Sequence, residues 1–302
     1  MTNIHKNISK TVTRFAPSPS GFLHLGHAYA ALFAWRLAQH SNGQFILRIE
    51  DLDKERRSKE FENCIYEDLE WLGISWNKPI MRQSDRSEAY KRAIDDLTQM
   101  KLLYPCFCTR KEILEEINIS NNAPHQNNNF GPIYPGICKN LENNKRNAFI
   151  ESGKPYALRL DTTKAKHIVG DLTWYDRIRG KQIVQVEKIG DVVLARKDIA
   201  SSYHLAVTID DAEQGITLIN RGNDLFESTH VHRLLQALLN LETPEWQHTA
   251  LLTDVNGKRL AKRENSLTLR SLRAKGIKGT DVWFEAIKNI ASQEKSGIGL
   301  KF

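Results

Sequence analysis

The start of the chain combines one apolar helical pattern with two short strand patterns, and this combination constrains the fold most. Residues 11-16 and 44-50 have the length and apolar content of short strands, and residues 27-40 (HAYAALFAWRLAQH) form a strongly apolar helical segment. Because one short crossover joins the two strands, they should be parallel neighbours. The segment predicts a βαβ unit that opens a Rossmann-type, doubly wound α/β sheet.

The remaining patterns indicate a sheet domain that is interrupted by a different middle segment. Helical patterns follow at 58-73 and 86-102, and another follows residue 228. Residues 154-195 are rich in strand patterns, and residues 203-221 (YHLAVTIDDAEQGITLINR) return to the character of a buried strand. We expect a first half of the Rossmann catalytic domain, an inserted subdomain, a second half of the Rossmann domain, and a basic loop with a short helical segment, at residues 1-103, 104-195, 196-240 and 241-302.

The composition is that of a soluble globular protein. Hydrophobic residues make up 40% of the chain and charged residues 26%, and no stretch approaches the roughly 18 apolar residues of a membrane span. The N-terminus, MTNIHKNISKTVTRF, lacks the apolar run of a secretory signal, so we expect a cytoplasmic protein with no membrane partner. The net charge of +7 is compatible with a polyanionic partner but does not require one.

A turn with two histidines lies where the first predicted strand gives way to the first predicted helix. Its sequence, from Pro17 to His27, is PSPSGFLHLGH, and its place is the ligand-binding edge of an open parallel sheet. Gly26 lets a flat ring or a phosphate approach the backbone, and the helix N-terminus adds partial positive charge. The imidazoles of His24 and His27 either stabilise charge on a phosphate or simply cap the helix.

Three of the four cysteines lie close together in the sequence. Cys106, Cys108 and Cys138 fall within 33 residues, whereas Cys64 lies alone in a helical pattern. In a chain without a secretory signal, clustered cysteines favour a metal site over disulfides. Three thiolates and a fourth ligand can hold zinc tetrahedrally in a closed, structural site. The alternative is that these cysteines pack in a core, as we expect for Cys64.

Four motifs occur in the order found in class I glutamyl-tRNA synthetases. The segment RFAPSPSGFLHLGH, followed by FILRIEDLD, resembles the start of that family, including its HIGH signature. YHLAVTIDD from Tyr203, RGNDLFES from Arg221 and RLAKR from Arg259 follow in the family's order, so the resemblance covers about residues 11 to 265. It implies the class I aminoacyl-tRNA synthetase fold and the ATP-dependent formation of glutamyl-adenylate, with Mg²⁺ accompanying ATP.

The resemblance gives roles to residues that would otherwise be unremarkable. Glutamate carries two carboxylates and an ammonium, so its pocket needs a fixed guanidinium, a carboxylate and an orienting donor. Which arginine takes the side-chain carboxylate stays open. The implied catalytic residues are His24, His27 and Lys262; the implied ATP-binding residues are His24, Gly26, His27, Arg259 and Lys262; the implied glutamate-binding residues are Arg14, Ser18, Glu50, Tyr203 and Arg221.

A basic cluster, KRLAKR at 258-263, holds four cations in six residues. Considered alone, it is a solvated loop. The resemblance identifies it with the mobile KMSKS loop, in which Lys262 neutralises triphosphate charge as pyrophosphate leaves. Arg259 replaces the first lysine of that motif and Ala261 replaces its serine. Because the charge is kept and a hydroxyl is lost, we expect function with altered loop behaviour.

The cysteine cluster is spaced as in glutamyl-queuosine tRNA(Asp) synthetases, the short paralogues of glutamyl-tRNA synthetases. The arrangement is C-x-C, then 25 residues, then Tyr134-x-x-x-Cys138. An Asn-rich insertion at 118-130 lengthens the gap and contains His125, a rival fourth ligand of softer chemistry. The intact Y-x-x-x-C spacing favours tyrosine. The ligands of one structural Zn²⁺ that the resemblance implies are Cys106, Cys108, Tyr134 and Cys138.

The length after the basic cluster favours the short paralogue. Only 39 residues follow Arg263, so we expect no anticodon-binding domain. The resemblance then implies transfer of activated glutamate to the queuosine base at the wobble position of tRNA(Asp), by a monomer whose partners are that anticodon stem-loop, glutamate and ATP. The alternatives are a truncated glutamyl-tRNA synthetase that charges the 3′ end of tRNA(Glu), and a catalytically silent RNA-binding or regulatory paralogue.

Overall fold

The computed structural model describes residues 10–119, 133–196, 201–250 and 268–284. The chain divides into two compact units. The first unit comprises residues 1–84, 215–223 and 244–302, and the second comprises residues 85–214 and 224–243. None of the helices in the described residues is long and apolar enough to cross a membrane. The domain boundaries expected near residues 103, 195 and 240 stay a prediction.

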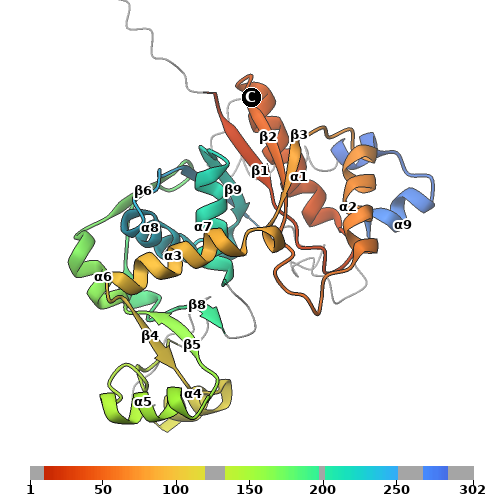
Figure 1. The fold of residues 1–302 in the computed structure, drawn as a ribbon. Helices are drawn as coiled ribbons and strands as arrows, with labels where there is room; N and C mark the ends of the chain where they lie inside the picture. Colours follow the sequence, from red (N-terminus) through yellow and green to blue (C-terminus); the bar gives the residue numbers. More distant parts are fainter. Residues whose placement is uncertain (1–9, 120–132, 197–200, 251–267, 285–302) are drawn as a thin grey trace, which may run out of the picture. The chain divides into compact units, whose positions relative to one another are not determined.

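The first unit is built on parallel strands (Figure 1). Its strands are β1 (Val12–Phe15), β2 (Gln44–Ile49), β3 (Asn77–Arg82), β9 (Leu218–Gly222) and β10 (Glu245–Thr249). Hydrogen bonds join β1, β2 and β3 in that order, and β9 pairs with β10. β1 also contacts β9, because the N–H of Thr217 donates to the carbonyl of Val12 at 3.0 Å. The predicted βαβ unit is therefore confirmed, with α1 (Leu25–His40) as its helix.

The core of the first unit joins α1 to the sheet. Ala28, Leu32 and Phe33 of the helix share one buried cluster with Phe45 of β2. The buried hydroxyl of Thr13 in β1 donates to the carbonyl of Ala34 at 2.8 Å, so this polar side chain is satisfied inside the core. These contacts fix the N-terminus of α1 at the carboxyl end of β1, the edge at which open parallel sheets bind ligands.

Two further helices of the first unit pack on each other, α2 (Lys59–Trp71) and α9 (Leu269–Ala274). Nη2 of Arg273 in α9 lies 2.8 Å from Oε2 of Glu67 in α2. The same Nη2 atom lies 3.5 Å from Oδ1 of Asp68, which is fully buried. Neither carboxylate oxygen of Asp68 has a hydrogen-bond partner in the described part of the chain. Burial without hydrogen-bond partners disfavours the charged form of this acid.

Burial raises the pKa of Asp68 to about 6, and Arg273 opposes this only in part. The unfolded chain keeps the ordinary value of 3.8, so the native state binds more protons between about pH 4 and pH 6. Stability therefore falls as pH rises through that window. Asp68→Asn should raise the free energy of unfolding by about 2 to 3 kcal/mol above pH 6 and little at pH 4. Urea denaturation at pH 4 and pH 8 measures this, and equal effects at both pH values would contradict the assignment.

The second unit combines helices with short antiparallel strands (Figure 1). β4, β5 and β8 form one antiparallel sheet, and β6 and β7 form a hairpin. The strand-rich prediction for 154-195 is confirmed for its strands but missed α6, which buries only Thr162 and Ala165. The elements are α3 (Ser87–Gln99), β4 (Leu103–Cys106), α4 (Arg110–Ile119), α5 (Asn143–Glu151), β5 (Ala157–Leu160), α6 (Thr162–Val169), β6 (Thr173–Asp176), β7 (Gly180–Ile183), β8 (Val193–Arg196), α7 (Tyr203–Glu213) and α8 (Ser228–Leu238).

The prediction of a buried strand throughout 203-221 is wrong. The first part of this segment is the helix α7, and β9 begins only at Leu218. The side chain of Ser202 caps the helix by accepting from the N–H of Leu205 at 3.4 Å. Consecutive residues of α7 are buried, so no helical period marks the sequence. A helix that is buried on most sides has a continuous apolar pattern, which periodicity cannot distinguish from a buried strand.

Candidate active site

The histidine turn forms the N-terminal cap of α1. Nδ1 of His24 accepts from the N–H of Gly26 at 3.0 Å, and Nδ1 of His27 accepts from the N–H of His24 at 3.2 Å. The centroids of the two rings are 3.9 Å apart. A Cβ atom on residue 26 would lie 2.9 Å from Cε1 of His24, so the turn needs glycine there. The histidines therefore cap the helix, as one of the two interpretations of the sequence expects.

The two caps also determine where each ring carries its proton. A neutral imidazole that accepts a hydrogen bond at Nδ1 has its proton on Nε2. We infer that His24 and His27 each present an N–H donor on the opposite side of the ring, at a helix N-terminus that carries partial positive charge. Capping and phosphate binding use different atoms of the same ring. The two interpretations of this turn are therefore compatible.

Three of the predicted glutamate-binding residues lie on neighbouring parallel strands of the first unit. Arg14 lies in β1, Glu50 directly follows β2, and Arg221 lies in β9. Both arginines are 7% exposed, whereas Glu50 and Ser18 are half-buried. The N–H of Glu50 donates to the carbonyl of Pro17 at 3.0 Å, which ties the ends of β1 and β2 together. The sheet thus carries buried guanidinium groups and a carboxylate on adjacent strands.

The two buried arginines are positioned by different contacts. Nη1 of Arg14 donates to the carbonyl of Asn220 at 3.4 Å, and Nε of Arg221 donates to Nε2 of His248 at 3.0 Å. A buried guanidinium with a fixed orientation is a strong site for a carboxylate, which it can bind through two parallel hydrogen bonds. Two such groups on neighbouring strands could bind a ligand that has more than one carboxylate.

The sequence reasoning missed Arg48, which contacts Glu50. Arg48 is fully buried in β2, and its Nη2 atom lies 3.2 Å from Oε1 of Glu50. A signal was present, because Arg48 interrupts the apolar strand QFILRI and arginine is almost never fully buried unless paired. This ion pair fixes the position of the carboxylate that the sequence assigned to substrate binding.

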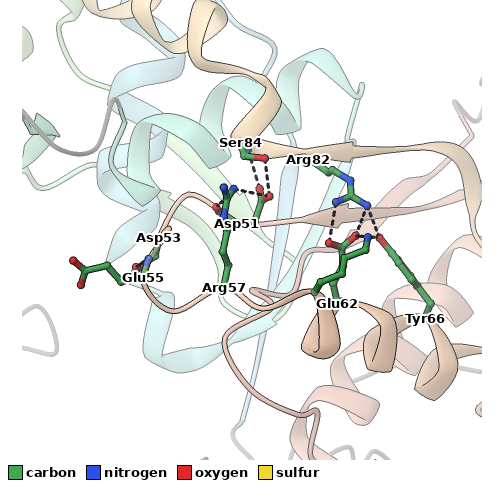
Figure 2. Close-up of polar contacts among 9 residues, drawn as sticks. Asp51, Asp53, Glu55, Arg57, Glu62, Tyr66, Arg82 and Ser84 are labelled. Carbon is green, nitrogen blue, oxygen red and sulfur yellow. Dashed lines mark hydrogen bonds and ion pairs between the residues drawn. The ribbon is translucent and has the colours of Figure 1, made fainter.

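The loop after Glu50 is anchored by Asp51 (Figure 2). Its carboxylate accepts from the N–H of Ser84 at 2.8 Å and from the hydroxyl of Ser84 at 2.7 Å. Nη1 of Arg57 lies 3.4 Å from Oδ2 of the same carboxylate. Because Ser84 lies in the short helical turn Gln83–Asp85 after β3, Asp51 ties the end of β2 to the end of β3. The backbone of Glu50 is thus held by both neighbouring strands.

A second polar cluster holds α2 to β3 (Figure 2). Glu62 of α2 accepts hydrogen bonds from Tyr66 and from Arg82, with 2.8 Å between Nη1 of Arg82 and Oε2 of Glu62. Burial opposes the charge of Glu62, yet the hydrogen bonds from Tyr66 and Arg82 outweigh it and lower the pKa of this carboxyl. Glu62 therefore stays ionised at neutral pH and clamps the helix to the strand.

Tyr203, the remaining predicted glutamate-binding residue, belongs to the second unit. It is the first residue of α7 and is 36% exposed. Its ring meets the rings of His204 and His232, with centroids 5.5 and 5.7 Å away. Nδ1 of His204 and Nε2 of His232 are 3.2 Å apart, within hydrogen-bond distance. Two paired imidazoles therefore support the tyrosine ring. His232 comes from α8, and no signal in the sequence predicted its contact with Tyr203.

Three residues of the sequence-based assignment, Arg259, Lys262 and His125, lie outside the described residues. The chain that follows the basic cluster is described from Thr268 onward. There the N–H of Leu269 donates to the carbonyl of Leu23 at 2.8 Å, and Thr268 forms an antiparallel bridge with His24. The segment after the basic cluster therefore pairs directly with the histidine turn.

The three clustered cysteines meet in the second unit. The sulfur atoms of Cys106, Cys108 and Cys138 all lie within 4.8 Å of one another, and those of Cys108 and Cys138 are 3.4 Å apart. The hydroxyl of Tyr134 lies 3.4 Å from the sulfur of Cys106 and 3.7 Å from that of Cys108. Cys64 is buried in α2 of the first unit, as expected. The structure thus brings Tyr134 to the three thiols.

This donor set fits a tetrahedral metal ion. Zinc bound to thiolates at about 2.3 Å separates their sulfurs by about 3.8 Å, close to the spacing here. Burial opposes ionisation of Cys106, but hydrogen bonding with Tyr134 and Arg159 lowers its pKa. Burial and the neighbouring Cys138 raise the pKa of Cys108 to about 12. Three thiolates this close together would repel one another, and a bound cation would remove that repulsion.

The arrangement of Tyr134 is set by contacts on both sides of its ring. The guanidinium carbon of Arg159 lies 3.8 Å from the ring centroid, and the hydroxyl accepts from the N–H of Cys138 at 2.8 Å. The N–H of Phe107 donates to the sulfur of Cys138 at 3.3 Å. Two backbone donors thus hold the sulfur of Cys138 and the phenol oxygen of Tyr134 in place. These contacts are typical of the groups that orient metal ligands.

Comparisons with known proteins agree on one family. A family profile described as "tRNA synthetases class I (E and Q), catalytic domain" matches residues 10–289. The chain is 41% identical over 281 residues to a glutamyl-Q tRNA(Asp) synthetase of Rhodobacter capsulatus. This alignment covers 90% of this chain and 98% of the relative. It is 36% identical to a glutamate-tRNA ligase of Aquifex aeolicus, over 89% of this chain and 55% of the relative.

A solved structure shows the same fold. The crystal structure of a glutamate tRNA ligase from Elizabethkingia meningosepticum, in complex with its amino acid, matches with a TM-score of 0.70 and 31% identity. The match covers 84% of this chain and 52% of that protein. The chain thus spans about half the length of these two ligases, but nearly the whole length of the Rhodobacter relative.

Proposed function

Because the chain belongs to the class I tRNA synthetases (E and Q) and, among them, to the glutamyl-Q tRNA(Asp) synthetases, we propose that it activates glutamate with ATP and transfers it to the queuosine base at the wobble position of tRNA(Asp). It is a ligase of the aminoacyl-tRNA synthetase type. One observation carries the proposal. The histidine cap of α1 leaves two ring donors at a helix N-terminus, in the unit whose parallel strands carry Arg14, Glu50 and Arg221.

The first proposed step forms glutamyl-adenylate. A carboxylate oxygen of glutamate attacks the α-phosphorus of ATP, and the bond from that phosphorus to pyrophosphate breaks. The Nε2–H groups of His24 and His27 donate to phosphate oxygens as their charge grows, and Gly26 lets the nucleotide approach the helix N-terminus. Lys262 and Arg259 neutralise the departing pyrophosphate, and Mg²⁺ accompanies the triphosphate.

Glutamate is bound by groups that match its three charges. The guanidinium groups of Arg14 and Arg221 take its two carboxylates, and their burial makes these contacts strong. Glu50, fixed by Arg48, pairs with the ammonium group. Tyr203 and Ser18 supply hydroxyl groups that orient the substrate. Within the first unit, the ties of Glu50 to Arg48 and to the carbonyl of Pro17 favour catalysis by positioning.

We further propose that Cys106, Cys108, Tyr134 and Cys138 hold one structural Zn²⁺. The spacing of the sulfurs and of the tyrosine hydroxyl supports this set. Cys106 ends β4 and Cys108 follows it, whereas Tyr134 and Cys138 lie near residue 136, so one ion would join two parts of the second unit that are distant in sequence. With four protein ligands no position stays open for substrate, and the ion would act in folding and not in the reaction.

The most specific part of the proposal is the group that accepts the activated glutamate. The Rhodobacter relative, which the chain covers over 98% of its length, supports the queuosine base as acceptor. Transfer moves the glutamyl group from the adenylate to that base and releases AMP. The positive net charge of +7 favours a nucleic-acid partner.

Transfer should depend on queuosine. We expect labelled glutamate to appear on tRNA(Asp) that contains queuosine, and no transfer above background to the same tRNA without it, because a site built for a polar group rejects substrates that lack it. Nuclease digestion should locate the label on the queuosine nucleoside. Label on the 3′-terminal adenosine of tRNA(Glu) would contradict this acceptor. ATP–pyrophosphate exchange with glutamate, measured without RNA, tests the activation step separately.

A further inference from the structure

The hairpin of β6 and β7 in the second unit exposes large apolar side chains on one face. Tyr175 is 49% exposed and Ile183 is 63% exposed. The register pairs Tyr175 with Lys181 and Thr173 with Ile183. Directly opposed residues share a face of an antiparallel pair, as do alternate residues of one strand, so these four side chains are neighbours. The outer face of the hairpin is defined here as Thr173, Tyr175, Lys181 and Ile183.

The other face of the hairpin is firmly anchored. Trp174 is buried, and its ring meets the rings of Phe226 and His230 with centroids 5.0 and 6.0 Å away. Asp176 is fully buried, and its Oδ1 atom accepts from the N–H groups of Ile178 and Arg179 at 2.9 Å each, which fixes the turn. Strand alternation then forces Tyr175 outward. The exposed tyrosine is thus presented by a rigid element.

The hairpin carries three cations, Lys181 on the outer face and Arg177 and Arg179 in the turn. Arg177, Arg179 and Lys181 are all exposed, and the one acid in the segment 173–183 is the buried Asp176. The guanidinium carbon of Arg179 lies 4.0 Å from the ring centroid of Phe226, so this cation is held beside the hairpin. A flat exposed aromatic ring among cations suits unpaired nucleotides, because bases stack on the ring while cations contact the phosphates.

We propose that the outer face of the β6–β7 hairpin binds unpaired nucleotides of the RNA substrate, with Tyr175 stacking on a base and Lys181 contacting the backbone. The proposal rests on the proposed function in naming an RNA loop as the partner. A double helix keeps its bases stacked on one another and offers no free base face, so the surface distinguishes a loop from a stem. Ile183 extends the apolar platform beside the tyrosine.

Replacement of Tyr175 tests the stacking contact. Tyr175→Ala should weaken binding of the tRNA(Asp) anticodon stem-loop by roughly 5- to 150-fold, the range for loss of one stacked base, whereas Tyr175→Phe should bind as the unaltered protein does. Lys181→Gln should reduce the slope of log Kd against log salt concentration by about 0.7. Fluorescence anisotropy with labelled RNA measures both effects. Phe284→Ala, which removes a 65% exposed aromatic ring from the first unit, is the matched control and should leave Kd unchanged.

Two comparisons separate base stacking from a general attraction between cations and RNA. An unchanged Kd in Tyr175→Ala would overturn the proposal, as would an equal loss of affinity for a perfectly paired RNA duplex. ATP–pyrophosphate exchange without RNA should keep its normal rate in Tyr175→Ala, because the ring lies outside the groups assigned to activation. If the unaltered protein lacks that exchange, the proposed function fails, while the RNA titrations still decide the role of the hairpin.

Discussion

Glu50→Gln should raise the KM for glutamate by about a hundredfold and leave the KM for ATP unchanged. The substitution keeps the size of the side chain but removes the charge that we propose pairs with the substrate ammonium. A hydrogen bond between charged groups contributes up to about 3 kcal/mol, which corresponds to a change of about a hundredfold or more. ATP–pyrophosphate exchange at varied glutamate concentration, with ATP saturating, measures the effect.

Glu55→Gln is the matched control, because it makes the same chemical change in the same loop. Glu55 is exposed, and Figure 2 shows its side chain pointing away from the contacts of Asp51. This variant should have normal kinetics. Glu50→Gln also removes the charged partner of the buried Arg48, so its melting temperature should be recorded in parallel. Equal increases in both KM values would indicate a disturbed fold and would argue against a direct contact with glutamate.

Cys138→Ser should abolish stoichiometric zinc binding and lower the melting temperature by about 10 °C. Loss of a structural metal ligand costs several kcal/mol, and each kcal/mol lowers the melting temperature by about 2 to 4 °C in a protein of comparable size. Treatment of the unaltered protein with a strong chelator should produce a similar shift. Metal analysis by mass spectrometry and thermal denaturation measure the two quantities.

Cys64→Ser provides the comparison for this experiment. Cys64 and Cys138 are 6% and 5% exposed, so both substitutions place a hydroxyl in a buried position, but only Cys138 belongs to the cluster. Cys64→Ser should therefore keep its full zinc content. If the purified protein contains no zinc, or if Cys138→Ser retains it, the cysteines pack as a core and the metal assignment is wrong.

The sequence predicts local chemistry better than it predicts burial. The βαβ unit was predictable because the turn at Pro17 to His27 separates a strand from an apolar helical pattern with a clear length. The helix α7 was not, because Leu205, Ala206 and Val207 are buried together and the pattern has no period. What distinguishes helix from strand there is tertiary contact, such as the pairing of Asp210 with Arg86 at 2.7 Å, and such contacts have no local signal.

In the candidate site, too, local sequence signals were predictable and tertiary contacts were not. The grouping of the three cysteines was predictable from their spacing, and the place of Tyr134 beside them was implied by the resemblance to the glutamyl-queuosine tRNA(Asp) synthetases. The support for Glu50 by Arg48, and for Tyr203 by His232, depends on which side chains the fold brings together. A charged residue inside an apolar strand is the one sequence signal that could have revealed any of these supporting residues.

Each histidine ring of this turn caps the helix and, as we propose, binds phosphate, so a mutation can remove one of these uses and keep the other. Asparagine is among the strongest helix N-caps, so His24→Asn would start α1 normally while offering no group on the far side of the cap. An allele of that kind would yield a protein of normal abundance with a silenced reaction. Surveys that score variants by expression level would class it as harmless, and only a readout of the modified RNA would reveal the loss.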